Sequence, residues 1–207
     1  MTMPQILIDI QNHLAANAPQ LSKDHIDGRI NSALNEEEVI EVIKKKFKIK
    51  EPAARQWYDF IAVDGANEYP VNIKVTALET TDNLNCKLGI YYAVTGVWPT
   101  FTNQTVWESF FKKVKADINT RTDRDYYFLV VGKSDPSDII LTSLKQIGTL
   151  VANGNNLPFQ CNWAKNRALK VRTHDESVKF ILGVLKKSCD LRANIKKEFE
   201  DHLNQYI

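Results

Sequence analysis

Residues 126–132, with the sequence YYFLVVG, are aromatic or aliphatic at every position up to the final glycine. A strand with one solvent-exposed face alternates apolar and polar residues, so an unbroken apolar strand is typical of burial on both faces. Such a strand needs a layer of structure on each side of its sheet. The segment therefore favours an α/β fold, in which a central mixed β-sheet is flanked by helices.

Sequence periodicity predicts the elements around this strand. Helices are expected over 4–17, 35–47, 83–96, 104–118 and 173–191, and a further helical segment is expected to reach the C-terminus. Further strands are expected over 56–63, 69–76 and 138–144, with the turn DGANE joining the first two. At 207 residues, the chain is expected to form one domain that spans residues 1–207.

Four residues are expected at helix ends. Asn35 is a candidate N-cap, because the three glutamates that follow it suit the positive end of a helix dipole. Gly96 ends the apolar segment before it, and Thr173 with Glu176 has the spacing of a capping box.

Composition narrows the class of protein. The formal net charge of +2 is too small to indicate nucleic-acid binding by itself. Cys86, Cys161 and Cys189 form no CxxC pair, which argues against a disulfide framework or a structural zinc site. The first residues lack the basic region of a signal peptide, and no apolar run has the length of a membrane helix. We therefore expect a cytoplasmic protein with no membrane partner.

Three polar residues interrupt strands that otherwise have the composition of a core. Asp59 lies in the first strand of the pair, and Asn72 and Lys74 lie in the second. We expect Asp59 and Lys74 to lie roughly opposite each other, so that their side chains converge at one end of the sheet. An exposed cross-strand ion pair is the ordinary alternative, but the many apolar neighbours favour a site.

The helix expected over 35–47 offers a further carboxylate. At about 100° per residue, its apolar stripe includes Ile40 and Ile43. Glu36 falls on this stripe and Glu37 lies next to it. A glutamate on a packing face needs a cation or a hydrogen-bond partner, so either residue is a candidate third member of the site.

A helix with an acid, a strand with an aspartate, and a strand that ends in acid, any residue, lysine occur in this order in one group of nucleases. Here YDF supplies the aspartate and VNIKVT supplies the lysine. Over residues 35–96 the chain resembles the PD-(D/E)xK nuclease superfamily, in particular the type II restriction endonucleases. The segment DNLNCKLGIYYAVTG is similar to the continuation in such enzymes. The resemblance implies a restriction-endonuclease-like form of the α/β fold.

The resemblance also implies a role for each polar residue. The catalytic candidates are Asp59, Asn72, Lys74, Glu36 and Glu37. Mg²⁺ would be bound by Asp59, Asn72 and the backbone carbonyl of Ile73. Lys74 would orient or deprotonate the attacking water, or stabilise the charge at phosphorus.

Two positions depart from the superfamily pattern. Asn72 stands where the second acid is expected, and Tyr58 stands where a proline precedes the aspartate. An amide oxygen can bind a cation but brings no charge, so Mg²⁺ should bind more weakly. Asn72 is then the native residue of an active branch, or an inactivating replacement in an engineered variant, or the mark of a relative that binds without cutting.

The activity implied is Mg²⁺-dependent, sequence-specific cleavage of double-stranded DNA. One active site per chain implies a homodimer on a short palindrome. Three alternatives stay open: a structure-specific repair or junction nuclease, a non-catalytic or inactivated DNA-binding relative, and an α/β interaction domain that binds no nucleic acid.

Two polar stretches are candidates for contact with DNA. They supply nine residues: Asp82, Asn83, Lys87, Asn153, Asn155, Asn156, Gln160, Asn162 and Lys165. Asn and Gln side chains can pair with adenine, and Lys can reach guanine or phosphate. The ordinary explanation of residues 153–167 is an Asn-rich turn followed by a strand with polar residues on its outer face.

Overall fold

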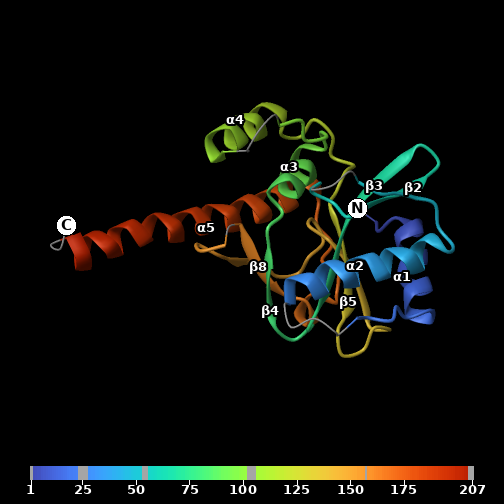
Figure 1. Ribbon diagram of the computed structural model, residues 1–207. Helices are drawn as coiled ribbons and strands as arrows, with labels where there is room; N and C mark the ends of the chain where they lie inside the picture. The colour runs from blue at the N-terminus through green and yellow to red at the C-terminus, as the bar shows by residue number, and fades with distance from the viewer. Residues whose placement is uncertain (1, 23–27, 53–55, 102–105, 157, 205–207) are drawn as a thin grey trace.

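The computed structural model describes residues 2–22, 28–52, 56–101, 106–156 and 158–204 (Figure 1). In chain order, its elements are α1 (Gln5–Ala16), α2 (Gly28–Lys44), β1 (Ile49–Lys50), β2 (Phe60–Asp64), β3 (Asn67–Thr76), β4 (Thr81–Leu84), α3 (Lys87–Thr95), α4 (Trp107–Asp117), β5 (Tyr127–Gly132), β6 (Ile139–Ser143), β7 (Val151–Ala152), β8 (Phe159–Asn162), the 3₁₀ turn η1 (Ala164–Asn166) and α5 (His174–Leu203).

The strands form two sheets. The larger has the order β1-β2-β3-β5-β6, with β3 and β5 parallel and the other neighbours antiparallel. The smaller has the order β4-β8-β7 and is antiparallel. The expected α/β fold with a mixed sheet is therefore confirmed.

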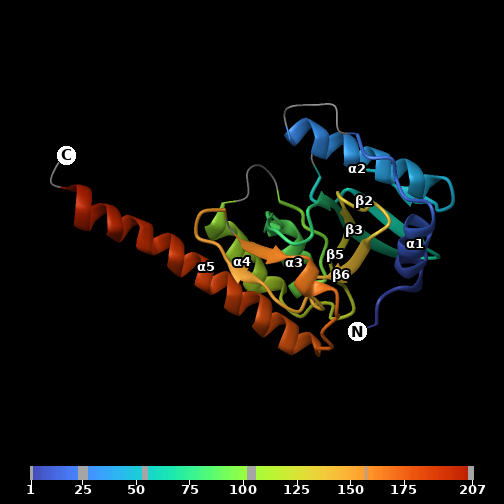
Figure 2. The same cartoon turned by 90° about the horizontal axis from the view of Figure 1, so that it is seen from below.

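The larger sheet separates two cores. Ile73 and Leu129 face one core, which they share with α1 and α2. Phe128 and Val130 face the other, which is built with α3, α4, α5 and the smaller sheet. Figure 2 shows α1 and α2 on one side and α3, α4 and α5 on the other. Every residue of β5 is buried, as its unbroken apolar sequence predicts.

Two predicted helix starts are wrong, and the strand expected over 56–63 begins only at Phe60. Helix α2 begins at Gly28, so Asn35 is no N-cap but lies inside the helix, where its side chain is only 3% exposed. The segment expected as one helix over 83–96 begins instead as the end of β4, because residues 81–84 pair with β8. In both cases tertiary packing overrides the local preference of the sequence. The predicted end at Gly96 is confirmed, since this glycine caps α3 with a φ of 69°, a conformation that favours glycine.

Helix α5 has the predicted capping box. The Thr173 hydroxyl accepts from the backbone N–H of Glu176 (3.3 Å), and the Glu176 carboxylate accepts from the N–H of Thr173 (2.8 Å). The helix then continues for 30 residues, and its second half extends away from the rest of the molecule (Figures 1 and 2). None of the helices in the described ranges is both long and apolar enough to cross a membrane.

Asp125 is a buried carboxylate at the entry to β5, only 2% exposed. It accepts hydrogen bonds from the backbone N–H groups of Tyr126 (2.8 Å) and Lys145 (3.3 Å). Burial raises the pKa of Asp125 to about 6, and the positive charge of Lys145 opposes this rise. The folded chain therefore holds a proton on Asp125 at a pH where the unfolded chain has lost it.

The Asp125→Asn variant tests the effect of this buried carboxylate on stability. Because the folded-state pKa of Asp125 lies above its ordinary value of 3.8, the wild-type free energy of unfolding should fall as pH rises through about 4 to 6. The Asp125→Asn variant has no carboxyl group at this position, so its free energy of unfolding should not show this fall. Relative to wild type, its free energy of unfolding should improve by about 2–3 kcal/mol between about pH 4 and pH 7.5, as measured by urea unfolding. The exposed Asp64 gives the matched control: Asp64→Asn should follow wild type. Parallel curves for Asp125→Asn and wild type would contradict the expectation.

Candidate functional site

The carboxylate of Asp59 lies where the chain enters β2. Its Oδ2 accepts hydrogen bonds from the amide of Asn72 (2.7 Å) and from the backbone N–H of Ile73 (2.6 Å). Its own N–H donates to the carbonyl of Val71 (2.9 Å). No described residue donates a hydrogen bond to the other carboxylate oxygen, Oδ1. One oxygen therefore fixes the side chain, and the second is left for a ligand.

Asp59 and Lys74 are not opposite each other, contrary to the sequence expectation. The hairpin turns at Gly65 and Ala66, so that Asn72 lies beside Asp59 and Lys74 lies two residues farther along β3. Side chains two residues apart on a strand share a face, so Asn72 and Lys74 project on the same side of the sheet. Along β3, the Asn72 side chain thus comes first, beside the carboxylate of Asp59, and the Lys74 side chain follows on the same face.

The two charged side chains beside Asn72 have different electrostatic environments. Burial raises the pKa of Asp59, whereas the hydrogen bond from Ile73 and the positive charge of Lys74 lower it. Lys74 is half-buried and donates no hydrogen bond or ion pair to any residue in the described ranges. A cation that is partly removed from water without a hydrogen-bonded partner favours an anionic ligand.

A pocket of about 140 Å³ lies beside this group. It is lined by Asn72 and Lys74 of β3, and by residues from three other places: 56–57, 84–86 and the start of β5. Asp59 does not line the pocket but is joined to it through Asn72. The pocket brings together the strand pair, the smaller sheet and the N-terminus of α3.

An aromatic cluster before Asp59 was not anticipated from the sequence. The ring of Trp57 lies 5.0 Å from that of Trp98, 5.4 Å from Tyr92 and 5.3 Å from Tyr126, between centroids. The hydroxyl of Tyr126 donates to the carbonyl of Trp57 (2.5 Å). These contacts hold the backbone two residues before Asp59. The two adjacent aromatic residues that precede the aspartate were the available signal.

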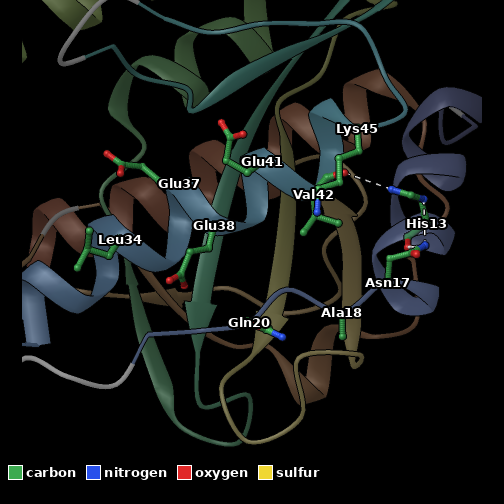
Figure 3. Close-up of a pocket in the computed structure, with 10 residues that line it drawn as sticks. All are labelled: His13, Asn17, Ala18, Gln20, Leu34, Glu37, Glu38, Glu41, Val42 and Lys45. Carbon is green, nitrogen blue, oxygen red and sulfur yellow. Dashed lines mark hydrogen bonds between the residues drawn. The ribbon is translucent and has the colours of Figure 1, made fainter.

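The helix glutamates have a different environment. Helix α2 packs through Val39 and Ile43 on the face of the sheet away from Asn72. Glu37 is exposed and lines an open groove of about 660 Å³ between α1 and α2 (Figure 3). Glu36 is half-buried on the same helix. Neither glutamate lines the pocket beside Asn72, so the predicted third carboxylate is not placed there.

The donor set fits a hard divalent cation in part. Asp59 Oδ1, the side-chain oxygen of Asn72 and the carbonyl of Ile73 are oxygen ligands of the kind that Mg²⁺ prefers. Within the described ranges, however, no three His, Cys, Asp or Glu side chains lie close enough together to hold a metal ion. The group therefore offers one negative charge, and any cation it binds would take the rest of its ligands from water and substrate.

No known protein family matches the chain, and a search of curated proteins finds no match. The function is therefore inferred from the chemistry of the site itself.

Most residues expected to contact DNA are held by internal hydrogen bonds in the smaller sheet. The side-chain oxygen of Asn83 accepts from both Asn153 and Gln160 (3.0 Å each). The indole N–H of Trp163 donates to the carboxylate of Asp82 (2.9 Å). Through these hydrogen bonds, β4 is connected to β8, to Trp163 and to the loop between β7 and β8.

The loop between β7 and β8 depends on one asparagine. Asn153 Oδ1 accepts from the backbone N–H groups of Asn155 and Asn156 (3.0 Å each). Farther on, Asn162 accepts from the backbone N–H of Lys165 (3.1 Å) and donates to a backbone carbonyl. Both asparagines thus stabilise turns, which is the ordinary role of the residue.

Four of the nine candidates differ from the rest. Asn155, Asn156 and Lys165 have exposed side chains, and Lys87 lies over the ring of Trp107, 4.0 Å from its centroid. Contact of any of the nine with DNA stays a prediction, and the three exposed residues are the ones with side chains open to a partner.

Asn72→Asp is expected to make stability depend on Mg²⁺. Two carboxylates at the separation of Asn72 and Asp59 repel each other unless a proton or cation lies between them. At pH 8 with a chelator, the free energy of unfolding should fall by about 1–3 kcal/mol, and MgCl₂ should restore most of the loss. Thermal unfolding with and without Mg²⁺ measures this.

Asn85→Asp provides the matched control, because Asn85 is exposed at the same pocket. It adds the same charge at a side chain that forms no hydrogen bond with a carboxylate in the described part of the chain, so Mg²⁺ should change its stability little. Equal responses of the two variants to Mg²⁺ would contradict the cation site.

Asn153→Ala is expected to destabilise the chain by about 1–3 kcal/mol, because it removes a buried amide that donates to Asn83 and accepts from the backbone N–H groups of Asn155 and Asn156. Asn155→Ala removes an exposed side chain and should change the free energy of unfolding by less than about 0.5 kcal/mol. Urea unfolding compares the two. If both variants match wild type, the loop does not depend on Asn153.

Proposed function

We propose that this protein is a Mg²⁺-dependent endonuclease that acts on double-stranded DNA. One observation carries the proposal: Lys74, without a hydrogen-bond partner in the described ranges, projects on the same face as Asn72, which binds the carboxylate of Asp59. Phosphodiester hydrolysis needs this combination, a carboxylate to hold a cation and a positive charge beside the phosphate. The resemblance of YDF and VNIKVT to nuclease motifs supports the same assignment.

Each residue then has a defined task. Mg²⁺, when bound, would lower the pKa of a water molecule and neutralise charge on the phosphate. Asp59, Asn72 and the carbonyl of Ile73 would hold the cation. Lys74 would donate hydrogen bonds to a phosphate oxygen or to the attacking water. Because burial raises the pKa of Asp59, protonation should weaken cation binding at a higher pH than for an exposed aspartate.

The finer assignment is a type II restriction enzyme of the cytoplasm that recognises a short palindrome. With one site per chain, cutting both strands at a symmetric sequence needs two copies related by a two-fold axis. Sequence recognition would come from exposed polar residues such as Asn155, Asn156 and Lys165. A structure-specific repair or junction nuclease would use the same site without them.

A second candidate function, DNA binding without cleavage, is favoured by Asn72. The amide donates to one oxygen of Asp59, and this hydrogen bond holds the carboxylate in place without a metal ion. An acid at position 72 would instead need a cation to relieve repulsion. A site whose side chains are held in place without metal suits a protein that holds phosphates but does not hydrolyse them.

Digestion of a sequenced supercoiled plasmid separates these functions. Wild type with Mg²⁺ should cut at a fixed sequence, and chelator should abolish the cutting. Asp59→Asn and Lys74→Ala should each lower the rate by about 100-fold or more. Asp64→Asn and Lys112→Ala make the same substitutions at exposed positions and should cut as wild type does. Unfolding midpoints measured alongside establish that the variants are folded.

The other outcomes distinguish the alternatives. Cutting only in the Asn72→Asp variant, together with a salt-dependent gel shift by wild type, would identify the non-catalytic binder. Cutting at junctions or flaps and at no fixed sequence would identify a structure-specific nuclease. If neither wild type nor any variant binds or cuts DNA, the proposal is overturned.

A further inference from the structure

The second half of α5 carries an apolar stripe whose side chains are about half exposed, although Gly154 lies against Leu191, the first residue of the stripe. The first half packs into the core through Val178 and Ile181. Beyond Ser188, Leu191 is 47% exposed, Ile195 is 50% exposed and Phe199 is 45% exposed. Both views show this part of the helix extending past the sheets and the other helices (Figures 1 and 2). Large apolar side chains in a row on a helix are the usual mark of a helix–helix contact.

The three exposed residues lie in one line. They are spaced four residues apart, so at about 100° per residue they fall within a strip about 80° wide, centred on Ile195. Leu191 is one turn before this residue and Phe199 is one turn after it. The stripe therefore has apolar groups at equal distances on either side of its centre.

The charges along the same helix are divided by position. Residues 186–197 contain five basic residues and one acidic residue, whereas residues 198–201 contain three acidic residues and no basic one. The ion pairs that these charges form within the helix, such as Lys196–Glu200 at 3.3 Å, are exposed and contribute little to stability. A parallel pair of such helices would place like charges side by side. An antiparallel pair places the basic part of each helix against the acidic end of the other.

We propose that the second half of α5 is a dimer interface, on which a second copy of this chain binds in antiparallel orientation. The stripe and the division of charge both select a copy of the same helix, because each is complementary to itself under a two-fold rotation near Ile195. Leu191 of one copy then packs near Phe199 of the other. The inference depends on the helix and not on the proposed nuclease activity.

The flanks of the stripe give a charge contact that can be tested. At about 100° per residue, Lys187 and Glu198 lie on the same flank of the stripe, on opposite sides of its centre along the helix. In the antiparallel pair centred on Ile195, residue 187 of one copy lies opposite residue 203 of the other, so Lys187 is about 7.5 Å along the axis from Glu198. In a parallel pair the two residues would be separated by about 16 Å along the axis.

The interface should be weak. Residues 190–202 span about 20 Å of helix, which is at the small end of specific interfaces. We therefore expect a dimer that dissociates on dilution. Sedimentation equilibrium of the full chain, from about 1 µM to about 1 mM and without DNA or Mg²⁺, should show a mass that rises from one chain to two.

Ile195→Glu is the decisive variant. It adds a charge at the centre of the stripe and should raise the dissociation constant at least about tenfold. Ala193→Glu adds the same charge on the opposite, exposed side of the helix and should leave it unchanged. Both positions are exposed, and glutamate favours helix, so both variants should fold. A wild-type chain that stays monomeric throughout, or an Ile195→Glu variant that still dimerises as wild type does, would overturn the proposal.

Charge reversal tests the orientation. Lys187→Glu should weaken association several-fold, and adding Glu198→Lys to the same chain should restore it. If the double variant associates no better than the single one, the antiparallel arrangement is wrong. Plasmid cleavage by these variants is a separate measurement, so failure of the interface and failure of the nuclease proposal can be told apart.

Discussion

The parallel pairing of β3 with β5 is the constraint on which both the core and the candidate site depend. It sets Ile73 beside Leu129 on one face of the sheet, and Asn72 beside Phe128 on the other. A strand whose two faces are both buried has no room for polar side chains unless a pocket opens beside them. The small pocket at Asn72 and Lys74 is that opening, and it lies where the sheet, the smaller sheet and α3 meet.

The hydrogen bond between Asn72 and Asp59 then decides how this group behaves. With an amide at position 72, the carboxylate has a neutral hydrogen-bond partner, and Lys74 forms no hydrogen bond or ion pair with any residue that the structure describes. With an acid there, the charges would sum to −1 before any cation was bound, and the fold would need Mg²⁺ or a proton to relieve the repulsion. The same residue that weakens cation binding therefore keeps the strand pair stable without metal. In the proposed nuclease, this single position would set the balance between catalysis and simple binding of an anion.

The periodicity of the sequence was sufficient to predict the fold class but not the boundaries of the helices and strands. The apolar β5 and the capping box of α5 depend on local sequence, and both were predicted. Asn35 was assigned to a helix end because capping residues and buried mid-helix polar residues look alike without tertiary contacts. Within the site, Asp59, Asn72 and Lys74 could be found from sequence because polar residues in apolar strands are conspicuous. The partnership of Asp59 with Asn72 rather than with Lys74 depends on strand register, which the turn sets to the exact residue.

Two surfaces of this chain show how far a sequence pattern can predict contacts with other molecules. The Asn-rich stretch around Asn153 has the composition of a DNA-contacting loop, yet Asn153, Gln160 and Asn162 all bind other parts of the chain. The second half of α5 has the composition of an ordinary amphipathic helix, yet Leu191, Ile195 and Phe199 on its apolar stripe stay about half exposed. A sequence pattern states what kind of contact a segment can make, and only the folded chain states whether that contact is already made internally. Contacts with other molecules are therefore to be sought where a pattern predicts a partner and the fold supplies none.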